Sequence, residues 1–404
     1  MKVAFFLHSF PTISETFILN QITGLIDLGV DIEIFAFRNP KQEKHHLDID
    51  KYRLMNKVTY LEPNTRIKKF FELIKLIPEF CFRNTSLFIE CFNIKNFGRD
   101  AIKLRALFAA YHMQGSNSHI IYCHFGPMGL FMVKLKSLLK KNWEIITSFH
   151  GYDLSSLTDR RGNNIYKELF TEGDIFLPIS KFWKRKLISM GCSNKKIIVH
   201  HMGVDTKKFK FFKRKHTSNQ FTVLTVGRLV EKKGYEFSIK AVAKLIKRYK
   251  NIKYIIVGDG PLRNKLKSLV TALNLDKHVT FTGWLEKNEA IDLYKKADVF
   301  LLPSITAKNR EMEGIPVVLM EAQSSGIPVI STYHSGIPEI VSNNKSGFLV
   351  REKDVDEIVK KLQVLIKDDS LRFKMGRVGR KIVMEEYDIR KLNKNLKQIF
   401  ENFR

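Results

Sequence analysis

The hydrophobic pattern alternates between two kinds of segment along most of the chain. Short runs of β-branched and aromatic residues are each followed by a longer segment whose apolar residues recur every three or four positions. The short runs predict β-strands and the longer segments predict amphipathic helices. Ten strands are expected on this basis, at residues 3–7, 32–37, 120–124, 145–149, 175–178, 222–226, 254–257, 279–282, 299–302 and 328–331.

Strands that alternate with helices are typical of an α/β fold, in which helices cover both faces of a parallel sheet. The alternation stops once, at residues 204–219, where lysines and arginines crowd without a helical or strand period. We therefore expect two domains of similar architecture, 1–203 and 220–385, joined by a basic linker at 204–219.

The last segment, 386–404, is expected to form a helix that packs back on the rest of the protein. Its apolar residues recur at three- and four-residue spacing and share one face, namely Ile389, Leu392, Leu396 and Phe400.

The segment 66–113 is helical by the same criterion, but its apolar and cationic residues are interleaved. They are Phe70, Phe71, Leu73, Ile74, Leu76 and Ile77 on one hand, and Lys68, Lys69, Lys75 and Arg83 on the other. One interpretation, which we favour, is a set of helices packed on the first sheet with a solvated basic rim. The other is an amphipathic surface that meets anionic lipid, and one surface can satisfy both.

The net charge narrows the choice of partners. With 69 lysines and arginines against 41 aspartates and glutamates, the formal charge is +28. Such an excess indicates an anionic partner, which can be nucleic acid, an acidic membrane surface or a phosphorylated substrate. No zinc-finger, RRM or homeodomain pattern accompanies the charge, so no nucleic-acid partner is expected.

Neither membrane insertion nor export is indicated by the sequence. No uncharged apolar run approaches the roughly 18 residues of a membrane span. The apolar start at 3–7 lacks a small-residue cleavage site. The four cysteines form neither a C-x-x-C pair nor a zinc spacing, as expected for reduced thiols in a cytosol, and they are Cys81, Cys91, Cys123 and Cys192. We expect a cytoplasmic protein, peripheral at the inner face of the plasma membrane.

The first candidate site is the loop 227–234, which joins the strand at 222–226 to the next helix. Gly227 and Gly234 allow a ligand to approach the backbone closely. Arg228 offers a bidentate fork and Lys233 a point charge to phosphoryl oxygens. Because ligands of α/β sheets bind where strands end, this loop predicts a phosphate pocket rather than a pair of solvated cations.

A second glycine turn, which contains Gly258, follows the strand at 254–257. A dinucleotide fingerprint would require a small third residue where the chain has Arg263, so NAD is not expected. Gly258 then serves either a tight turn before the next helix or a contact with a nucleotide.

The most specific element is a pair of carboxylates eight residues apart, Glu313 and Glu321. Gly314 and Pro316 between them favour a helix start, where free amides and the helix dipole attract a diphosphate. Glu321 is expected about two turns, or roughly 12 Å, from Glu313 along the axis. The residues at 317–320 are too apolar for simple solvation, so the pair is expected to reach two ends of one ligand.

Histidines follow two strands of the first half. His150 comes after the strand at 145–149 and beside a glycine, which directs it to the crevice between the domains, although a structural role is the alternative. His124 has a similar setting with weaker support.

Two polar segments are assigned no chemistry. Ser14 is expected to cap the first helix. Asp48 and Asp50, with His45 and His46 nearby, are expected to form a solvated loop rather than a metal site.

Together these elements resemble glycosyltransferase family 4, whose members have the GT-B fold. The loop 227–234 resembles the family's G-R-x…K-G phosphate loop, 257–261 its V-G-D-G-P turn, and 313–321 its E-x-seven-E signature. The resemblance covers nearly all of the second domain. In the first domain, three segments resemble the exopolysaccharide branch that includes the colanic-acid and amylovoran enzymes, namely 10–17, 124–126 and 150–153.

The resemblance implies two Rossmann-like domains that face each other across a cleft, with the C-terminal helix packing back. The first domain would bind the acceptor and the second a nucleotide-sugar. It further implies that Arg228 and Lys233 hold the donor diphosphate, that Glu313 contacts the transferred sugar and that Glu321 binds the ribose hydroxyls. The remaining residues that the family pattern places at the site are His150 beside the sugar and phosphate, Gly258 in the donor pocket, and Gly314 and Ile315 with backbone amides for the leaving group.

The resemblance also implies a reaction that retains the configuration of the anomeric carbon, with catalysis by Glu313, His150, Lys233 and Arg228. A nucleoside-diphosphate-sugar is the expected co-substrate, without a cofactor or metal ion. Because of the charge, we expect a saccharide acceptor linked to polyprenyl diphosphate, as in surface polysaccharide, exopolysaccharide or lipopolysaccharide biosynthesis.

Other classes of protein remain as alternatives. A sugar-nucleotide epimerase or a phosphorylase would share the fold, although no cofactor lysine of a phosphorylase is identified. A basic membrane- or nucleic-acid-binding protein without catalysis would explain the charge but not the pair of glutamates.

Overall fold

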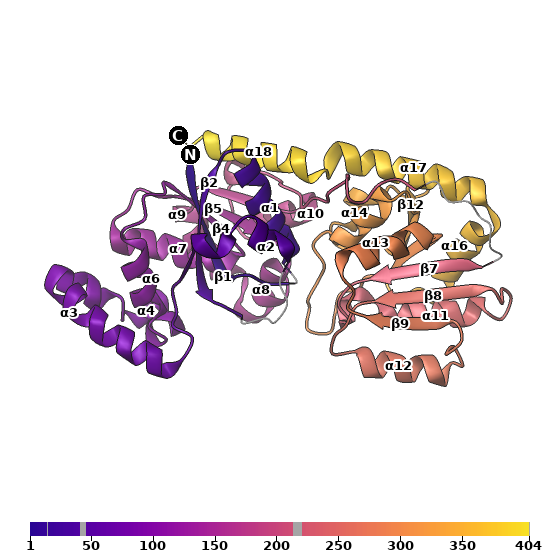
Figure 1. Ribbon diagram of the computed structural model, residues 1–404, viewed down its shortest axis with the longest axis horizontal. Helices are drawn as coiled ribbons and strands as arrows, with labels where there is room; N and C mark the ends of the chain where they lie inside the picture. The colour runs from indigo at the N-terminus through magenta and orange to yellow at the C-terminus, as the bar shows by residue number, and fades with distance from the viewer. Residues whose placement is uncertain (14, 41–45, 213–219, 404) are drawn as a thin grey trace.

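The computed structural model describes residues 1–13, 15–40, 46–212 and 220–403. Within these residues, twelve strands form two six-stranded sheets, and neighbouring strands in each sheet are parallel (Figure 1). The strands of the first sheet, in spatial order, are β3 (Val58–Tyr60), β2 (Asp31–Arg38), β1 (Lys2–Ser9), β4 (Ile120–His124), β5 (Glu144–Phe149) and β6 (Ile175–Pro178). Those of the second are β12 (Gly347–Val350), β11 (Val329–Thr332), β10 (Val299–Leu302), β7 (Phe221–Val226), β8 (Ile252–Val257) and β9 (Val279–Gly283).

Helices cover both faces of each sheet. The first half contains α1 (Thr16–Asp27), α2 (Leu47–Lys51), α3 (Arg66–Glu90), α4 (Ile94–Phe97), α5 (Arg99–Ile102), α6 (Arg105–Met113), α7 (Gly126–Leu139), α8 (Ser156–Arg161), α9 (Lys167–Glu172) and α10 (Lys181–Ser189). The second half contains α11 (Tyr235–Leu245), α12 (Arg263–Ala272), α13 (Lys287–Lys296), α14 (Val317–Ser324), α15 (Ile337–Ile340), α16 (Val355–Lys367), α17 (Asp369–Glu386) and α18 (Ile389–Glu401).

The ten predicted strands are all present, and their burial explains why the pattern identified them. In β4 and β10, for example, every residue is buried, as expected for a parallel strand covered on both faces. The sequence did not predict β3 and β12, which are the outermost strands at one end of each sheet. β3 contains only three residues, none of them fully buried, and β12 begins with Gly347, a residue type that is depleted in strands.

Two local predictions differ from the structure or fall outside it. Asp48 and Asp50 lie in the short helix α2 rather than in a loop. Among the described residues, no group of three or more His, Cys, Asp and Glu side chains is arranged to hold a metal ion. Ser14 and His45 lie outside the described residues, and α1 begins after Glu15, which makes no side-chain capping bond.

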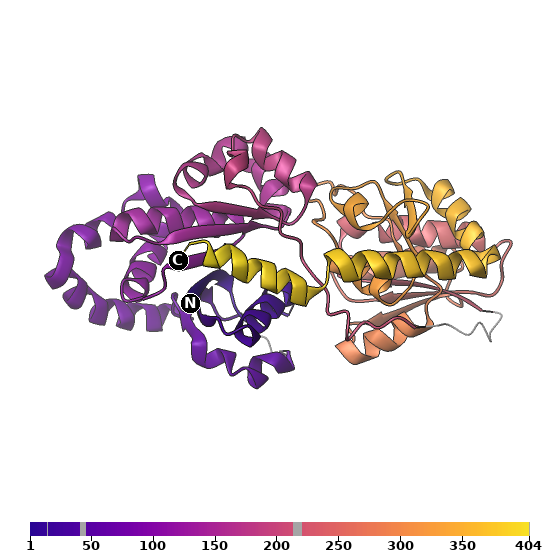
Figure 2. The same ribbon diagram turned by 90° about the horizontal axis from the view of Figure 1, so that it is seen from above.

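The last helix packs back on the rest of the protein, as predicted, and together with α17 it connects the two halves. Helix α17 packs on α14 in the second half, and α18 packs on α1 in the first (Figures 1 and 2). The apolar face of α18 is buried, and the ring of Phe400 lies 5.3 Å from that of Tyr122 on β4. Asn393 Nδ2 also donates to the backbone oxygen of Asn20 on α1, at 3.1 Å.

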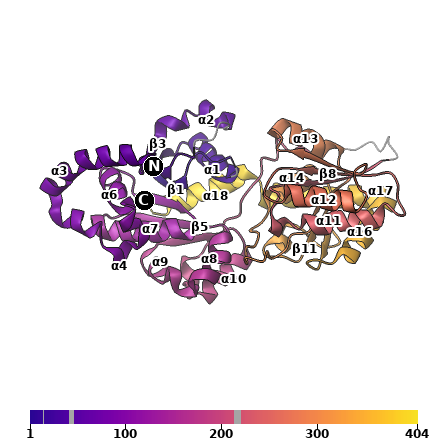
Figure 3. The same cartoon turned by 90° about the horizontal axis from the view of Figure 1, so that it is seen from below.

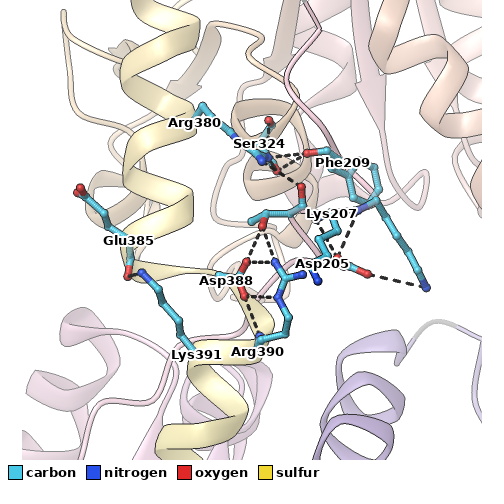
Figure 4. A network of polar contacts seen from close by, with 11 residues as sticks. Asp205, Lys207, Phe209, Ser324, Arg380, Glu385, Asp388, Arg390 and Lys391 are labelled. Carbon is cyan, nitrogen blue, oxygen red and sulfur yellow. Dashed lines mark hydrogen bonds and ion pairs between the residues drawn. The ribbon is translucent and has the colours of Figure 1, made fainter. Parts of the chain in front are cut away.

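Arginines fix the place where the chain crosses between the halves, shown close up in Figure 4. Arg380 on α17 donates to the backbone oxygens of Thr206, Phe209 and Ser324. Arg390 pairs with Asp388 at the start of α18 and donates to the Thr206 hydroxyl. Residues before the second sheet are thereby bound to the helices that return from it.

Candidate active site

The strand order places the candidate site. In the first sheet the order reverses between β1 and β4, and in the second between β7 and β10. Ligands of such sheets bind beyond the carboxyl ends of the strands at this switch point. The functional residues are therefore expected in the loops that follow these strands and in the neighbouring loop after β5.

Lys233 and Glu313 meet at the switch point of the second sheet. Lys233 ends a short 3₁₀ turn after β7, and Glu313 lies in the loop between β10 and α14. Their Nζ and Oε1 atoms are 3.0 Å apart, and the side chains are only 13% and 8% exposed. The neighbouring Lys232 bonds instead to Glu311, with Nζ 2.6 Å from Oε1. Two adjacent lysines thus have different carboxylate partners.

The charges around Glu313 keep it ionised. Burial by itself would raise the pKa of the Glu313 carboxyl, but the positive charges of Lys233 and Lys232 hold that pKa below its ordinary value. Burial likewise works to lower the pKa of Lys232, and the charges of Glu313 and Glu311 more than reverse this and raise it. Arg228, in contrast, is exposed on the same loop. The site therefore holds a buried ion pair beside an exposed guanidinium.

A histidine that the sequence analysis missed holds the Glu313 backbone in place. The Glu313 amide donates to His334 Nε2 at 3.1 Å, and His334 Nδ1 lies 2.6 Å from Glu352 Oε1. Since Nε2 accepts a bond, the neutral ring carries its proton on Nδ1 and donates it to the carboxylate. Glu352 in turn accepts a bond from the Thr306 amide at 3.0 Å. This relay connects the start of the loop after β10 with Glu313 near its end.

Glycines bring the loops of the second sheet into contact. Gly258 has φ +129°, and a Cβ atom there would lie 2.1 Å from the Gly227 oxygen. Gly234 has φ +68°, and its Cβ would lie 1.9 Å from the Pro303 oxygen. Any side chain at either position would displace the loop 227–234, so both glycines have at least the turn-forming role considered for Gly258.

The two glutamates of the pair are not arranged along one helix, contrary to the prediction. Helix α14 begins only at Val317, so Glu313 lies in the preceding loop and the two carboxylates do not share one helical axis. Glu321 lies on α14, half-buried, and accepts a hydrogen bond from Tyr294 Oη at 2.7 Å. Tyr294 is fully buried on α13 and thus fixes the direction of the Glu321 carboxylate.

Beside the switch point of the first sheet, His150 and His124 pair through their rings. His124 Nδ1 lies 3.0 Å from His150 Nε2, and the rings are stacked with centroids 5.1 Å apart. Phe17 and Phe125 pack on His150, at 4.8 and 4.6 Å between ring centroids. Burial lowers the pKa of His150 to about 3, so its imidazole is neutral at physiological pH.

A buried carboxylate organises these histidine loops. Asp153 accepts backbone hydrogen bonds from Gly126, His150 and Gly151 at 2.9 to 3.0 Å. Burial nevertheless raises its pKa to about 6. Asp153 therefore ties the loop after β4 to the loop after β5, a role that its place in the sequence motif did not reveal.

The two halves touch at the candidate site. A Cβ atom on Gly314 would lie 2.2 Å from Ile179 Cδ1 and 2.9 Å from the His150 oxygen, both in the first half. Glu339 of the second half also accepts bonds from the amides of Lys181 and Phe182, at 2.9 and 3.0 Å, at the start of α10. Ile315 is buried in the core cluster that includes residues of both halves. The structure thus brings His150 close to Glu313 and Gly314.

A cavity of about 760 Å³ lies elsewhere, at the crossing between the halves, where it is lined by Phe211, Phe373, Met384 and several cations. Two of its arginines, Arg380 and Arg390, already bond to protein atoms. It is separate from the Lys233 and Glu313 pair, which lies at the switch point of the second sheet, where ligands of such sheets bind.

Comparison with known proteins agrees with the fold and the motifs. Residues 206–382 match the family model "Glycosyl transferases group 1", and residues 14–208 match "Glycosyltransferase Family 4". WcaL of Salmonella typhimurium, a glycosyltransferase named for colanic acid biosynthesis, is 36% identical over 99% of this chain and all of its own length. The amylovoran biosynthesis glycosyltransferase AmsK of Erwinia amylovora is 37% identical over 89% of both chains.

The fold also matches solved structures. Anabaena HepE, solved in complex with UDP and glucose, superposes with a TM-score of 0.75 at 16% identity and full coverage of both chains. The lipopolysaccharide outer core galactosyltransferase WaaB superposes with a TM-score of 0.70 at 20% identity, again with full coverage. The protein belongs to glycosyltransferase family 4 and has the GT-B fold. This membership favours a transferase over the epimerase and the non-catalytic binding protein.

Proposed function

We propose that the protein is a retaining hexosyltransferase that moves a sugar from a nucleoside-diphosphate-sugar to a saccharide acceptor. The observation that carries this proposal is the Lys233 and Glu313 pair at the switch point of the second sheet, with Arg228 exposed on the same loop. Cations held at such a point suit the oxygens of a diphosphate. The UDP bound to HepE, a protein of the same fold, supports a nucleotide donor.

In this proposal the second half, 220–385, binds the donor. Arg228 and Lys233 neutralise the charge that builds on the diphosphate as the sugar–phosphate bond breaks, and no metal ion is needed for this. The amides of Gly314 and Ile315 donate to the same leaving group, and the turn at Gly258 lines the donor pocket. Glu321, directed by Tyr294, accepts bonds from the ribose hydroxyls.

The sugar is held where the halves touch. Glu313 is ionised, and its carboxylate accepts bonds from the hydroxyls of the transferred sugar while its partner Lys233 faces the phosphate. The neutral His150 contributes a hydrogen bond to the sugar or phosphate from the first half. The leaving phosphate oxygen accepts the proton of the acceptor hydroxyl, so that attack occurs on the face of departure and the configuration is retained.

The first half, 1–203, is proposed to bind a saccharide acceptor linked to polyprenyl diphosphate at the inner face of the plasma membrane. The formal charge of +28 suits a diphosphate lipid in an anionic membrane. Relatives named for colanic acid and amylovoran biosynthesis support a place in exopolysaccharide or other surface-polysaccharide assembly. Among the described residues, no helix combines the length and apolar composition needed to cross a membrane.

A donor screen tests the proposal. Thermal unfolding is measured with UDP, GDP, ADP and their sugars, because a ligand at a hundred times its Kd stabilises the folded state by about 2.7 kcal/mol. The donor that responds is then incubated with the protein, and the first anomer released by slow hydrolysis is identified by proton NMR. We expect one base to respond and the anomer to be retained. An inverted first product, or no response to any nucleotide, contradicts the proposal.

A further inference from the structure

Helix α3 carries an apolar stripe that faces solvent. Helix α3 spans Arg66–Glu90, with a break in helical geometry at Asn84. Spacing of three and four residues places five side chains on one face, and each is between 40% and 71% exposed, namely Ile67, Phe70, Phe71, Ile74 and Ile77. An apolar stripe with this period normally faces a core.

Another face of α3 makes the contacts with the protein. Leu76 and Phe80 are buried, and Leu73 packs against the same cluster. The ring of Phe80 lies 6.3 Å from that of Tyr111 on α6. One stripe of the helix therefore packs on the protein, and a second stripe is exposed to solvent. The two interpretations of this segment, packing on the first sheet and contact with lipid, apply to different faces of one helix.

The exposed apolar side chains are concentrated in this region. Nine of the nineteen large hydrophobic residues that are exposed in the described parts of the chain fall within residues 67–102. Besides the five on the stripe, they are Ile89, Phe92, Ile94 and Ile102. An exposed apolar stripe accompanied by further exposed apolar side chains marks an interaction surface, whereas single exposed apolar residues do not.

The charge of the same surface identifies its partner. Exposed cations outnumber the exposed carboxylates of Glu72, which lies 4.0 Å from Lys75, and Glu90; the cations are Lys68, Lys75, Lys95, Arg99 and Lys103. A two-fold dimer through this face would bring two copies of the cationic set together, which like-charge repulsion disfavours. An anionic lipid bilayer satisfies both features, because its headgroups attract the lysines and its acyl boundary accepts the aromatic and aliphatic side chains.

We propose that α3, with the following segment to residue 103, docks the first half of the protein on anionic membranes by inserting the stripe centred on Phe70 and Phe71. Figures 1 and 3 place α3 at the end of the molecule remote from the second sheet. This docking deepens the membrane partner named under the proposed function and rests on it. Binding then has two components, electrostatic attraction that salt weakens and apolar insertion that salt does not.

Vesicle sedimentation tests the docking surface. The full chain is mixed with phosphatidylglycerol-containing vesicles or with pure phosphatidylcholine vesicles, in 0.05 M and 0.5 M NaCl. Wild type is expected to bind the anionic vesicles at least tenfold more tightly than the neutral ones, and to retain measurable binding at high salt. The double variant Phe70→Ser/Phe71→Ser is expected to lose at least tenfold in affinity and to be released completely by salt. Lys68→Gln/Lys75→Gln is expected to lose the preference for anionic lipid.

Matched variants on the second half control for general effects of lost charge or apolar area. Phe373→Ser removes a 43% exposed ring on α17, and Lys265→Gln/Lys267→Gln removes two exposed lysines on α12. Both are expected to bind vesicles like wild type. As a direct reporter, Phe71→Trp is expected to show a blue shift of its fluorescence when anionic vesicles are added.

The outcomes separate this inference from the proposed function. Unchanged vesicle binding by Phe70→Ser/Phe71→Ser, or an unshifted Phe71→Trp spectrum, overturns the docking surface. A wild-type dimer that this double variant makes monomeric, with no vesicle binding, shows a self-interface and overturns it too. In the proposed function, donor hydrolysis depends on Lys233 and Glu313 and needs no membrane. Its absence in wild type would therefore count against the transferase, whereas vesicle binding would still test the docking surface.

Discussion

Among single residues, the two neighbouring lysines of the loop 227–234 provide a test of the proposed donor site. Lys233 pairs with Glu313, whereas Lys232 pairs with Glu311. Lys233→Ala is expected to lower kcat roughly a hundred- to thousandfold, or about 3 to 4 kcal/mol, because it removes one preorganised charge from the diphosphate as its bond breaks. Donor binding should persist. Lys233→Arg should recover only part of the rate, since a planar fork does not replace a point charge.

The control for this prediction is Lys232→Ala, which removes an adjacent charge that has another partner. Its kcat is expected to stay within about tenfold of wild type, as steady-state kinetics with saturating donor will show. A kcat for Lys233→Ala equal to that of wild type would remove Lys233 from the site, because a purely structural ion pair with Glu313 would then be the remaining explanation.

The Tyr294 and Glu321 pair should affect donor binding rather than turnover. Ribose contacts are similar in the ground and transition states, so Glu321→Ala is expected to raise the donor KM and to change kcat little. Tyr294→Phe removes only the 2.7 Å hydrogen bond that directs Glu321, and a smaller rise in KM is expected, worth about 1 kcal/mol. In the double variant the effects should not add. A fall in kcat as deep as that of Lys233→Ala would show that the assigned role is wrong.

The residues that the sequence identified differ in kind from those it missed. Lys233, Glu313 and Glu321 were found because motif spacing and strand ends are local properties of the chain. His334 and Glu352 contact Glu313 and Thr306 across 21 and 46 positions, so no local pattern connects them. Their signal would have been a histidine two residues after the strand β11 and a glutamate two residues after β12, both at the edge where β10 also ends.

At the scale of elements, α10 shows how one half holds the other. Its first amides are capped from two sides, since Ser180 Oγ accepts from the Trp183 amide while Glu339 accepts from Lys181 and Phe182. A carboxylate at a helix N-terminus is favoured by the helix dipole. Because Glu339 belongs to the second half, this cap stabilises the contact between the halves as well as the helix.

Glu339→Ala is therefore expected to loosen the contact between the halves. The free energy of unfolding should fall by about 1 to 2 kcal/mol, as for a lost cap, and the radius of gyration measured by small-angle X-ray scattering should rise. Ser180→Ala is the matched control, because it removes a cap within the first half and should lower stability without changing the radius. Equal radii of gyration for the two variants would contradict the conclusion that Glu339 stabilises the contact between the halves.

At the scale of the whole molecule, the layer structure followed from the sequence but the contact between the halves did not. Periodicity predicted ten strands, two sheets and a terminal helix that packs back, because each of these depends on local apolar patterns. The contact of Gly314 with Ile179 and the His150 oxygen depends on residues from both halves, and the bonds of Arg380 to Thr206 and Phe209 join positions 174 and 171 residues apart. Each of these contacts involves single residues that are far apart in the sequence. They therefore produce no periodic pattern of apolar residues from which they could be predicted.

Buried histidines of the first half are expected to make the stability of the folded protein fall in mild acid. Burial lowers the pKa of His150 to about 3 and of His200 to about 4, and it holds the pKa of His124 well below its ordinary value. The unfolded chain protonates these rings near pH 6.5, whereas the folded protein does not. Their contribution is therefore complete above pH 6.5 and is lost as pH falls, by about 1.4 kcal/mol per pH unit for each ring.

Asp153 opposes the loss of stability in acid and so reduces its size. Burial raises its pKa to about 6, so below that pH the folded protein binds a proton that the unfolded chain takes up only near pH 3.8. This carboxyl offsets part of the histidine contribution, so a net loss of stability is expected as the pH falls from 6 towards 4. Urea unfolding at pH 7.5, 6.5, 5.5 and 4.5 measures the slope, and His200→Gln should make it shallower by about 1.4 kcal/mol per unit. A wild-type stability that is flat from pH 6.5 to 4.5 would mean that burial in the folded protein does not hold these rings neutral.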